Sequence, residues 1–322
     1  MQKIIILSGP TGIGKTETIE AIYHHIPCEI INVDIGSFYS PLTIGTAKPD
    51  LNKISVPHHL LNIFDKPADY TIADFRKRAQ LLVQEIHARK NIPLFVGGSV
   101  FYIQSLFYKC PEISNVEISL VQELEKKNSL QLWKELNELD PLRATQIHSN
   151  DHYRLVRALS IYYSTGKKPS SFSVQFQPIG CFYTIFLQRD RQDLYQRINE
   201  RTSFMLKHGW IEETQSLQNT IWEEFLIEKK VIGYDAILRY LWGKKDTASY
   251  QELENIIAQT TRNYAKRQIT FLKKLEKQLK NEICGGSDAW RKQCVVAQIN
   301  LTLYEHRLYI KHLLNSLENF IR

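Results

Sequence analysis

KIIILSGPTGIGKT occupies residues 3–16 and joins a short apolar run to a glycine-rich turn. The run at residues 4–7 is long enough for a buried strand. The turn matches G-x-x-x-x-G-K-[ST], in which successive backbone N–H groups point at one anion and the next helix adds its positive N-terminal dipole. We therefore predict a phosphate-binding loop in an α/β fold, a P-loop NTPase-like parallel sheet flanked by helices.

The residue types of this loop have distinct expected roles. Glycines at both ends let the backbone turn inward, Lys15 supplies a mobile positive charge for outer phosphate oxygens, and the Thr16 hydroxyl is placed to bind Mg²⁺. The less favoured interpretation is a glycine-rich turn without a ligand. The predicted phosphate-binding residues are Gly9, Pro10, Thr11, Gly12, Ile13, Gly14, Lys15 and Thr16.

The composition is that of a globular protein with a basic charge balance. The 322 residues carry a formal net charge of +7, which suggests a polyanionic partner without requiring one. The five cysteines are odd in number and lack C-x-x-C spacing, so we expect reduced thiols and neither a zinc site nor a disulfide framework. No apolar stretch approaches membrane-spanning length, and we expect a cytoplasmic protein with no membrane partner.

Two further apolar runs predict strands whose carboxyl ends lie beside the loop. Residues 29–33 end at Asp34, a position where open α/β sheets place ligands, although a cap of the following turn also fits this residue. Residues 93–96 end in Gly97-Gly98-Ser99, without the acidic residue that a P-loop ATPase usually carries there. Group transfer is therefore favoured over hydrolysis. Ser99 would hydrogen-bond a phosphate or a substrate amine, unless it caps the next helix.

The segment between these two strands contains a histidine pair and a helix start. His58 and His59 point to different sides of any regular element, which favours structural roles over a shared metal. Thr71 and Asp74 have the spacing of a capping box. The helix that follows has an apolar stripe that predicts packing on the sheet. The stripe consists of Phe75, Ala79, Leu82, Val83 and Ile86.

From about residue 117 the pattern becomes helical. Helices are expected at 117–126, at 130–139 and from a cap at Asn150 to Tyr163. On the last of these, Arg154 and Arg157 emerge together, either as a phosphate clamp or as a solvated basic face.

The later part of the chain returns to the sheet and then becomes helical again. Residues 182–187 predict a core strand, and residues 191–207 a long helix with Arg197 and Arg201 on one side, as in the lid of small-molecule kinases. Arg262 and Lys266 lie one helical turn apart and would reach phosphates together. Residues 279–322 show helical spacing, divided by a loop at 285–287.

Motifs spread over about residues 9–271 point to one family. They are GPTGIGKT (9–16), IGTAKP (44–49), PHHLLNIFD (57–65), PLFVGGSVFY (93–102), HSNDHYRLVRAL (148–159), GY (233–234) and AKRQIT (265–270). By these motifs the chain resembles the tRNA dimethylallyltransferase (tRNA isopentenyltransferase) family. IGTAKP, PHHLL and AKRQ are specific to that family, whereas the phosphate loop alone would name only a superfamily.

The resemblance implies a reaction, its substrates and a cofactor. A dimethylallyl group would pass from dimethylallyl diphosphate to the N6 amine of the adenine 3′ of the tRNA anticodon, with diphosphate released and Mg²⁺ as cofactor. The departing diphosphate needs N–H groups, a lysine and Mg²⁺. The exocyclic amine needs a general base. We expect the catalytic residues to be Asp34 as the base, Ser99 and Lys15, with the phosphate-binding residues named above holding the diphosphate.

The resemblance also assigns residues to the anticodon arm, which a basic helical face would hold through its phosphates. We expect a monomer. The expected tRNA-binding residues are Asp34, Ile35, Gly36, Ser37, Ser99, Tyr153, Arg154, Leu155, Val156, Arg157, Val231, Ile232, Gly233, Tyr234, Asp235 and Ala236, to which the residue pattern adds Arg262, Lys266 and Arg267.

The chain departs from the family pattern on the expected RNA side. Ile35 follows the strand carboxylate where the family has serine, Asp235 stands where a basic residue is usual, and an expected arginine is replaced near Ser119. Two alternatives therefore stay open, a P-loop kinase of a small metabolite and a catalytically weakened tRNA-binding paralogue. We expect a catalytic core with lid-like helices at 1–115 and 180–280, a helical tRNA-binding insertion at 116–179 and a helical C-terminal extension at 281–322.

Overall fold

The computed structural model describes residues 1–322 except 51–54, 110, 112–115, 244–246, 287 and 304–305. The chain divides into two compact units. The sheet unit comprises Met1–Phe107 and Pro178–Arg322, and the helical unit comprises Tyr108–Gln177. Each unit contains a hydrophobic core of its own.

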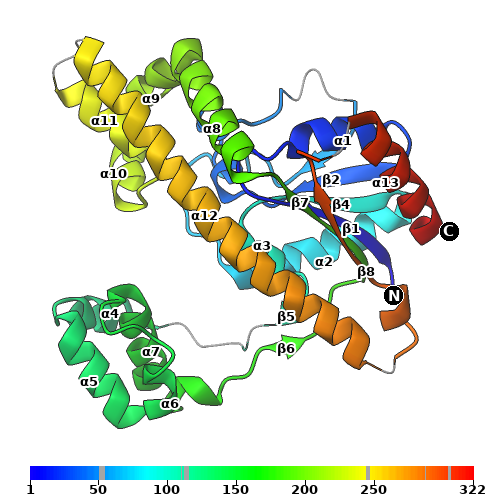
Figure 1. Cartoon of the computed structure of the whole chain (residues 1–322). Coiled ribbons are helices and arrows are strands. Elements are labelled where there is room, and N and C mark those ends of the chain that lie inside the picture. The colour runs from blue at the N-terminus through cyan, green and yellow to red at the C-terminus, as the bar shows by residue number, and fades with distance from the viewer. Residues whose placement is uncertain (51–54, 110, 112–115, 244–246, 287, 304–305) are drawn as a thin grey trace. The chain divides into compact units, whose positions relative to one another are not determined.

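A six-stranded sheet forms the centre of the sheet unit, and all of its pairings are parallel. The strand order is β3-β2-β4-β1-β7-β8. Because the strands are parallel, the loops that follow β1, β2, β4 and β7 meet at one edge. This arrangement confirms the predicted fold class (Figure 1). The strands are β1 (Lys3–Ser8), β2 (Cys28–Asn32), β3 (His58–His59), β4 (Ile92–Gly97), β7 (Cys181–Gln188) and β8 (Val295–Asn300).

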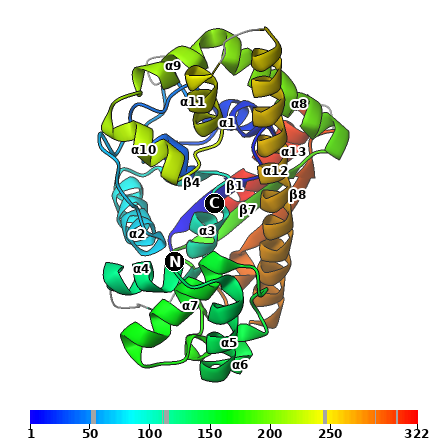
Figure 2. The ribbon, with the colours of Figure 1, turned by 90° about the vertical axis from the view of Figure 1, so that its left-hand side faces the viewer.

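The last strand corrects the expectation for residues 281–322, which were predicted to be helical. Val295–Asn300 instead forms β8 and pairs with β7. Its sequence, VVAQIN, is rich in β-branched residues, which favour strands where a neighbouring strand offers free backbone groups. Helix α13 (His306–Ile321) then follows as expected. It lies beside α1 (Lys15–Tyr23), as two views agree (Figure 1 and Figure 2).

Helices cover the sheet, and their starts follow from local sequence. The capping box at Thr71 and Asp74 is present at the start of α2 (Ile72–Ala88), and all five residues of its predicted stripe are buried. The 39-residue α12 (Thr247–Gly285) runs past α3, α8 and α11. The remaining helical elements of this unit are η1 (Ile35–Phe38), α3 (Val100–Ser105), α8 (Arg191–Met205), a π-helical turn (Leu206–Trp210), α9 (Ile211–Ser216), α10 (Ile221–Glu228), α11 (Tyr234–Trp242) and η5 (Arg291–Gln293).

The helical unit is built around α7 (His152–Thr165), which packs against α4 and α5. Asp151, rather than the predicted Asn150, caps α7, because its carboxylate accepts the N–H of Arg154. Gly166 ends the helix in a left-handed conformation, as glycine readily does. The other elements are β5 (Tyr108–Lys109), α4 (Ile118–Glu125), α5 (Ser129–Leu139), α6 (Pro141–Ala144), η3 (Pro169–Ser171) and β6 (Gln175–Phe176).

Within the described residues, no helix has both the length and the apolarity that crossing a membrane requires. Four cysteines fall in the described part of the chain, and each carries a free thiol. The fifth, Cys110, lies outside the described residues.

A buried carboxylate ties β2 to its neighbours. Glu29 is 1% exposed and accepts two hydrogen bonds from the Arg89 guanidinium, at 2.8 and 2.7 Å. Asn91 and His59 complete its shell, so His59 has the structural role that was favoured for it. The bonds from Arg89, helped by those from Asn91 and His59, outweigh burial and lower the pKa of Glu29 to about 2.

This carboxylate predicts an acid-dependent loss of stability. The ordinary pKa of 4.5 falls to about 2 on folding, so the unfolded chain binds more protons between those values. The stabilising contribution is complete above about pH 4.5 and is lost as the pH falls towards 2. It corresponds to about 3 kcal/mol. The free energy of unfolding of Glu29→Gln, measured in urea, should therefore depend less steeply on pH than that of the wild type over this range.

The matched control for this prediction is Glu85→Gln, because Glu85 pairs with Arg78 at the surface. That variant should keep the pH dependence of the wild type. A Glu29→Gln variant that lost stability with acid as steeply as the wild type would show that the carboxylate does not carry this contribution.

Candidate functional site

The phosphate loop occupies the turn between β1 and α1, as predicted. Gly12 and Gly14 have positive φ values of 76° and 112°, in the left-handed region that glycine adopts without strain. A Cβ at Gly12 would also lie only 3.0 Å from the side chain of Ile198. The motif glycines are therefore required by backbone conformation and by close packing.

Lys15 lies in the first turn of α1 and folds back over the loop. Its Nζ donates to the carbonyl oxygens of Gly9 and Pro10 at 3.1 and 3.2 Å. Burial lowers the pKa of Lys15, while the nearby Asp34 carboxylate acts to raise it. The same carboxylate favours the charged form of Arg201, whose pKa burial lowers. Two cations and one carboxylate therefore share this edge of the sheet.

Arg201 is a site residue that sequence reasoning did not assign. The helical spacing predicted that Arg201 lies on the same side of the helix as Arg197, but it did not predict that this side faces the phosphate loop. Arg201 lies one turn after Arg197 on α8, and the charges of Asp34 and Glu17 act to raise its pKa while burial lowers it. The available signal was the pair of arginines four residues apart after a core strand, the pattern typical of a lid.

Asp34 follows β2 and faces the end of β4. Its Oδ1 accepts the N–H of Gly98 at 2.6 Å, and its own N–H donates to Asn32 Oδ1 at 3.2 Å. It precedes the short helix η1, but its side chain makes no capping hydrogen bond there. The cap interpretation is therefore wrong, and the carboxylate is held towards the carboxyl ends of the strands.

Ser99 begins α3 without capping it by its side chain. Its Oγ instead accepts the N–H of Ile35 at 3.1 Å, which links the ends of β2 and β4. Tyr264, one turn before Gln268 on α12, is half-buried near the Asp34 carboxylate. Burial, aided by the charge of Asp34, raises the pKa of Tyr264 to about 12, so this phenol stays protonated.

Gln268 joins three parts of the site from α12 and is 2% exposed. Its Oε1 accepts the N–H of Thr11 in the phosphate loop at 2.9 Å, and its Nε2 donates to the carbonyl of Gly98 at 2.7 Å. A Cβ at Gly98 would lie 2.5 Å from that Nε2, so only glycine fits. Sequence reasoning missed this bridge, and the available signal was the glutamine in the AKRQ motif.

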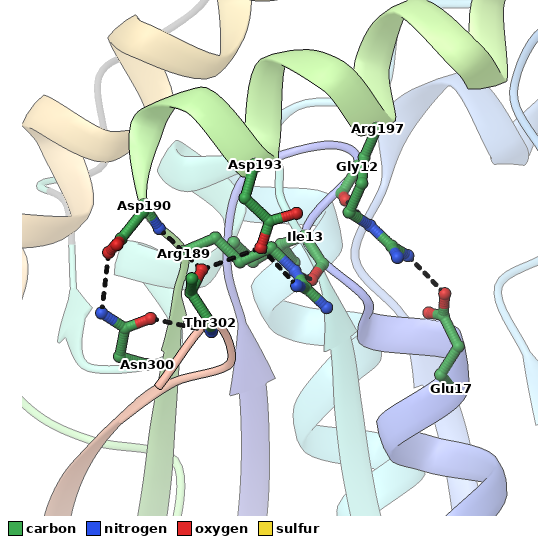
Figure 3. A network of polar contacts seen from close by, with 9 residues as sticks. All are labelled: Gly12, Ile13, Glu17, Arg189, Asp190, Asp193, Arg197, Asn300 and Thr302. Carbon is green, nitrogen blue, oxygen red and sulfur yellow. Dashed lines mark hydrogen bonds and ion pairs between the residues drawn. The ribbon is translucent and has the colours of Figure 1, made fainter. Parts of the chain in front are cut away.

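Two arginines hold the backbone of the loop from α8 and the end of β7 (Figure 3). Arg197 Nε donates to the carbonyl of Gly12 at 3.0 Å, and its guanidinium pairs with Glu17. Arg189 Nε donates to the carbonyl of Ile13 at 2.7 Å. These arginines occupy the carbonyls of Gly12 and Ile13, and of the loop N–H groups the one of Thr11 is already bonded by Gln268.

The expected tRNA-binding residues after Asp34 form η1. Ile35 is exposed and Gly36 is half-buried, but Ser37 is buried. The exposed position is thus the one at which this chain departs from the family pattern.

The segment 231–236 places the predicted Gly-Tyr pair inside the protein. Tyr234 is fully buried and donates its hydroxyl to Glu213, and the same carboxylate accepts the N–H groups of Thr43 and Ile44. A Cβ at Gly233 would overlap Trp210. Gly233 and Tyr234 are therefore buried, and the Tyr234 hydroxyl bonds the carboxylate that holds the IGTAKP loop. The half-buried residues of the segment are Val231, Ile232, Asp235 and Ala236.

The basic residues of α12 lie on the side that meets α8. Arg262 donates to Asn199, and the Lys266 ammonium lies 6.0 Å from the ring centre of Tyr195. Arg267 lies over the Tyr264 ring at 5.8 Å. The ammonium of Lys266 and the guanidinium of Arg267 belong to exposed residues, so this face presents positive charge to solvent.

In the helical unit, only part of the predicted segment reaches the surface. Tyr153 is 79% exposed, and Arg154 and Arg157 are exposed beside it. Arg154 pairs with Asp151 at 2.6 Å. Leu155 and Val156 are buried in the core of this unit. Direct contact with RNA by those two side chains is therefore excluded by their burial.

Comparisons with known proteins agree on one family. A family model described as IPP transferase matches residues 37–275. The tRNA dimethylallyltransferase of Alkaliphilus metalliredigens (strain QYMF) is 38% identical over 283 residues, which cover 85% of this chain and 90% of that protein.

Two solved structures resemble the chain over nearly its whole length. The full-length tRNA isopentenylpyrophosphate transferase from Bacillus halodurans aligns with a TM-score of 0.66 at 27% identity and covers 100% of this chain and 97% of that one. A eukaryotic dimethylallyltransferase acting on tRNA aligns with a TM-score of 0.74 at 25% identity, over 99% of this chain and 80% of that one.

The Gln268 bridge predicts a large effect of a substitution of similar shape. Gln268→Met should leave the Thr11 N–H and the Gly98 carbonyl without their partner, and each unpaired buried group costs about 1–3 kcal/mol. We expect urea unfolding to show a loss of about 2–6 kcal/mol in the free energy of unfolding, the sum over the two groups. Gln259→Met, on the exposed side of the same helix, should change stability by less than about 0.5 kcal/mol. Equal effects of the two substitutions would contradict the bridge.

Proposed function

The chain belongs to the IPP transferase family, and we propose on this premise that it transfers a dimethylallyl group from dimethylallyl diphosphate to tRNA. The acceptor is the N6 amine of the adenine 3′ of the anticodon, and diphosphate is released. The relative named tRNA dimethylallyltransferase and the structural neighbour acting on tRNA support the RNA substrate. The observation that carries the proposal is that Asp34 bonds the Gly98 N–H, while Gln268 joins Gly98 to Thr11 of the phosphate loop.

Departure of diphosphate explains the cations of the site. When the allylic C–O bond breaks, negative charge grows on the diphosphate oxygens, and preorganised donors lower the energy of that state. The N–H groups of the loop, the Lys15 ammonium and the Arg201 guanidinium are the donors on this chain. Because Arg189 and Arg197 occupy loop carbonyls, the site presents donors rather than acceptors to the anion.

The residues around the loop fit Mg²⁺ bound together with the diphosphate. Among the described residues, no three His, Cys, Asp or Glu side chains gather closely enough to hold a metal. Mg²⁺ commonly takes one or two protein oxygens and completes its shell with phosphate oxygens and water. The Thr16 hydroxyl, exposed in the first turn of α1, suits that role. Bound there, the ion would neutralise charge on the leaving group.

Attack on the prenyl carbon requires removal of a proton from the amine. The N6 lone pair forms the new C–N bond while the C–O bond breaks, and an N6 proton passes to the Asp34 carboxylate. The Gly98 N–H holds Asp34 in place for this step. Ser99, whose Oγ accepts the Ile35 N–H, supplies a hydroxyl at the same edge that orients the amine.

The acceptor base must leave its stack to reach this edge of the sheet. Exposed basic residues are available to hold the RNA through its phosphates, namely Lys266 and Arg267 on α12 and Arg154 and Arg157 on α7. One chain supplies the loop, the base and these faces, so we propose a monomer that acts where tRNA is found, in the cytoplasm.

A three-way assay separates this function from the alternatives. The protein is incubated with labelled dimethylallyl diphosphate, ATP and unmodified tRNA. We expect prenyl label in the RNA. Phosphoryl transfer to a small molecule would favour the kinase, which the named relatives do not support. Tight RNA binding with neither transfer would favour a catalytically weakened paralogue.

Asp34→Asn tests the general base. The amide keeps the acceptor for the Gly98 N–H but does not take a proton from the amine, so kcat should fall about 10²- to 10⁴-fold. Affinity for tRNA should change little. The control is Asp65→Asn, because Asp65 bonds Ser40 away from the loop. A variant at position 34 with wild-type turnover would remove this carboxylate from the mechanism.

Arg154→Ala tests the RNA-binding surface of the helical unit. Loss of one phosphate contact should weaken tRNA binding and reduce the slope of log K against log salt by about 1. Binding is measured by filter retention across a salt series. Arg78→Ala, which removes an exposed arginine from α2, should leave both quantities unchanged. An unaltered salt slope for the Arg154 variant would mean that this face of α7 does not meet RNA.

A further inference from the structure

The C-terminal part of the chain contacts the phosphate loop although it lies beyond the family match, which ends at residue 275. Thr302 stands just after β8, and its hydroxyl donates to Asp193 Oδ2 at 2.8 Å. The Thr302 hydroxyl oxygen in turn accepts the N–H of Asp190 at 3.0 Å. Asn300 donates to the Asp190 carboxylate and accepts the Thr302 N–H (Figure 3). Thr302 is thus fixed against the start of α8.

From Thr302 the contacts lead in two steps to the loop. Asp193 Oδ2 also accepts Arg189 Nη1 at 2.7 Å, and Arg189 Nε donates to the Ile13 carbonyl at 2.7 Å. Burial acts to raise the pKa of Asp193, but hydrogen bonds from Arg189 and Thr302 outweigh it and lower that pKa. The carboxylate therefore stays charged and keeps the Arg189 guanidinium in one orientation.

A second contact from the same segment reaches the next residue of the loop. The Tyr309 hydroxyl on α13 lies 3.3 Å from the Thr18 hydroxyl, which donates to the Gly14 carbonyl at 2.9 Å. Leu301 packs close by, since a Cβ at Gly14 would lie 3.3 Å from its Cδ1. C-terminal residues therefore act on the carbonyls of Ile13 and Gly14.

Because the peptide bond is planar, a contact that fixes a carbonyl of the loop also fixes the direction of the next residue's N–H group. The Ile13 carbonyl and the Gly14 N–H belong to one rigid trans peptide, and they point in opposite directions. Holding the carbonyl outward through Arg189 thus aims the Gly14 N–H inward. The Gly14 carbonyl and the Lys15 N–H are related in the same way.

We propose that Thr302 is a positioning residue for the phosphate loop, acting through Asp193 and Arg189 on the Ile13–Gly14 peptide. This inference rests on the proposed function, because it assigns Thr302 to the binding of the diphosphate. Without the Thr302 hydroxyl, Asp193 holds Arg189 less firmly, and the Gly14 N–H is less well aimed at the anion. RNA binding does not depend on this hydroxyl.

Thr302→Val removes the hydroxyl and keeps the shape of the side chain. We expect the dissociation constant for pyrophosphate, measured by titration calorimetry, and the KM for dimethylallyl diphosphate to rise about 3- to 10-fold, the usual effect of one lost hydrogen bond. The KM for tRNA should not change. Thr302→Ser, which restores the hydroxyl, should bind pyrophosphate as the wild type does.

A double-mutant cycle tests whether the effect passes through Asp193. Asp193→Asn alone should weaken pyrophosphate binding, and adding Thr302→Val to it should weaken binding little further, because the two side chains act in one chain of contacts. Additive losses would overturn the proposed route. Ser316→Ala, which removes a hydroxyl from α13 that bonds only its own helix in the contacts described, should behave as the wild type.

The outcomes separate this inference from the function on which it rests. A wild-type chain that binds no pyrophosphate and transfers no prenyl group would overturn the proposed function. A wild-type chain that binds pyrophosphate, together with a Thr302→Val variant that binds it equally well, would overturn the inference alone. Failure of Thr302→Ser to restore binding would also overturn it, since the hydroxyl would then not be the active group.

Discussion

The amide of Gln268 is the contact on which the geometry of the site depends. It takes the N–H of Thr11 and gives a hydrogen bond to the Gly98 carbonyl, so α12, the phosphate loop and the end of β4 meet at one side chain. The N–H of the same Gly98 is bonded by Asp34. Asp34 is thus held by the N–H of Gly98, and the anion-binding loop is tied through Gln268 to the carbonyl of Gly98. Because Gly98 has no Cβ, both side chains fit beside it.

A second constraint is the balance of charge around the loop. A loop that binds anions concentrates positive charge, which burial makes costly unless carboxylates or carbonyls face it. Here Asp34 acts on Lys15 and Arg201, Glu17 pairs with Arg197, and Asp193 pairs with Arg189. The last two pairs keep Arg197 and Arg189 on backbone carbonyls, so Lys15 and Arg201 are the cations proposed to meet an incoming phosphate.

The features that could be predicted correctly from the sequence are those determined by residues close together in the chain. The glycine loop, the capping box of α2 and the apolar stripe behind it depend on residues within a turn or two of each other, and all are present. The Gln268 bridge joins residues 257 positions apart, which no local pattern reports. The strand β8 was missed because an edge strand is recognised by its neighbour rather than by its own spacing. The burial of Tyr234 could not be predicted either, because it depends on a hydrogen bond to Glu213, 21 positions away.

The parts of the anion site lie at widely separated positions along the chain, and this has a consequence for biosynthesis. The ribosome makes the glycine loop long before Gln268 and Thr302, since Thr11 and Gln268 are 257 positions apart. Until those residues have been made, the loop lacks both its hydrogen bond to Gln268 of α12 and the contacts that reach it from Thr302 through Asp193 and Arg189. Contacts between such distant residues are slow to form. A nascent chain therefore gains the complete phosphate cradle only after Thr302 has left the ribosome.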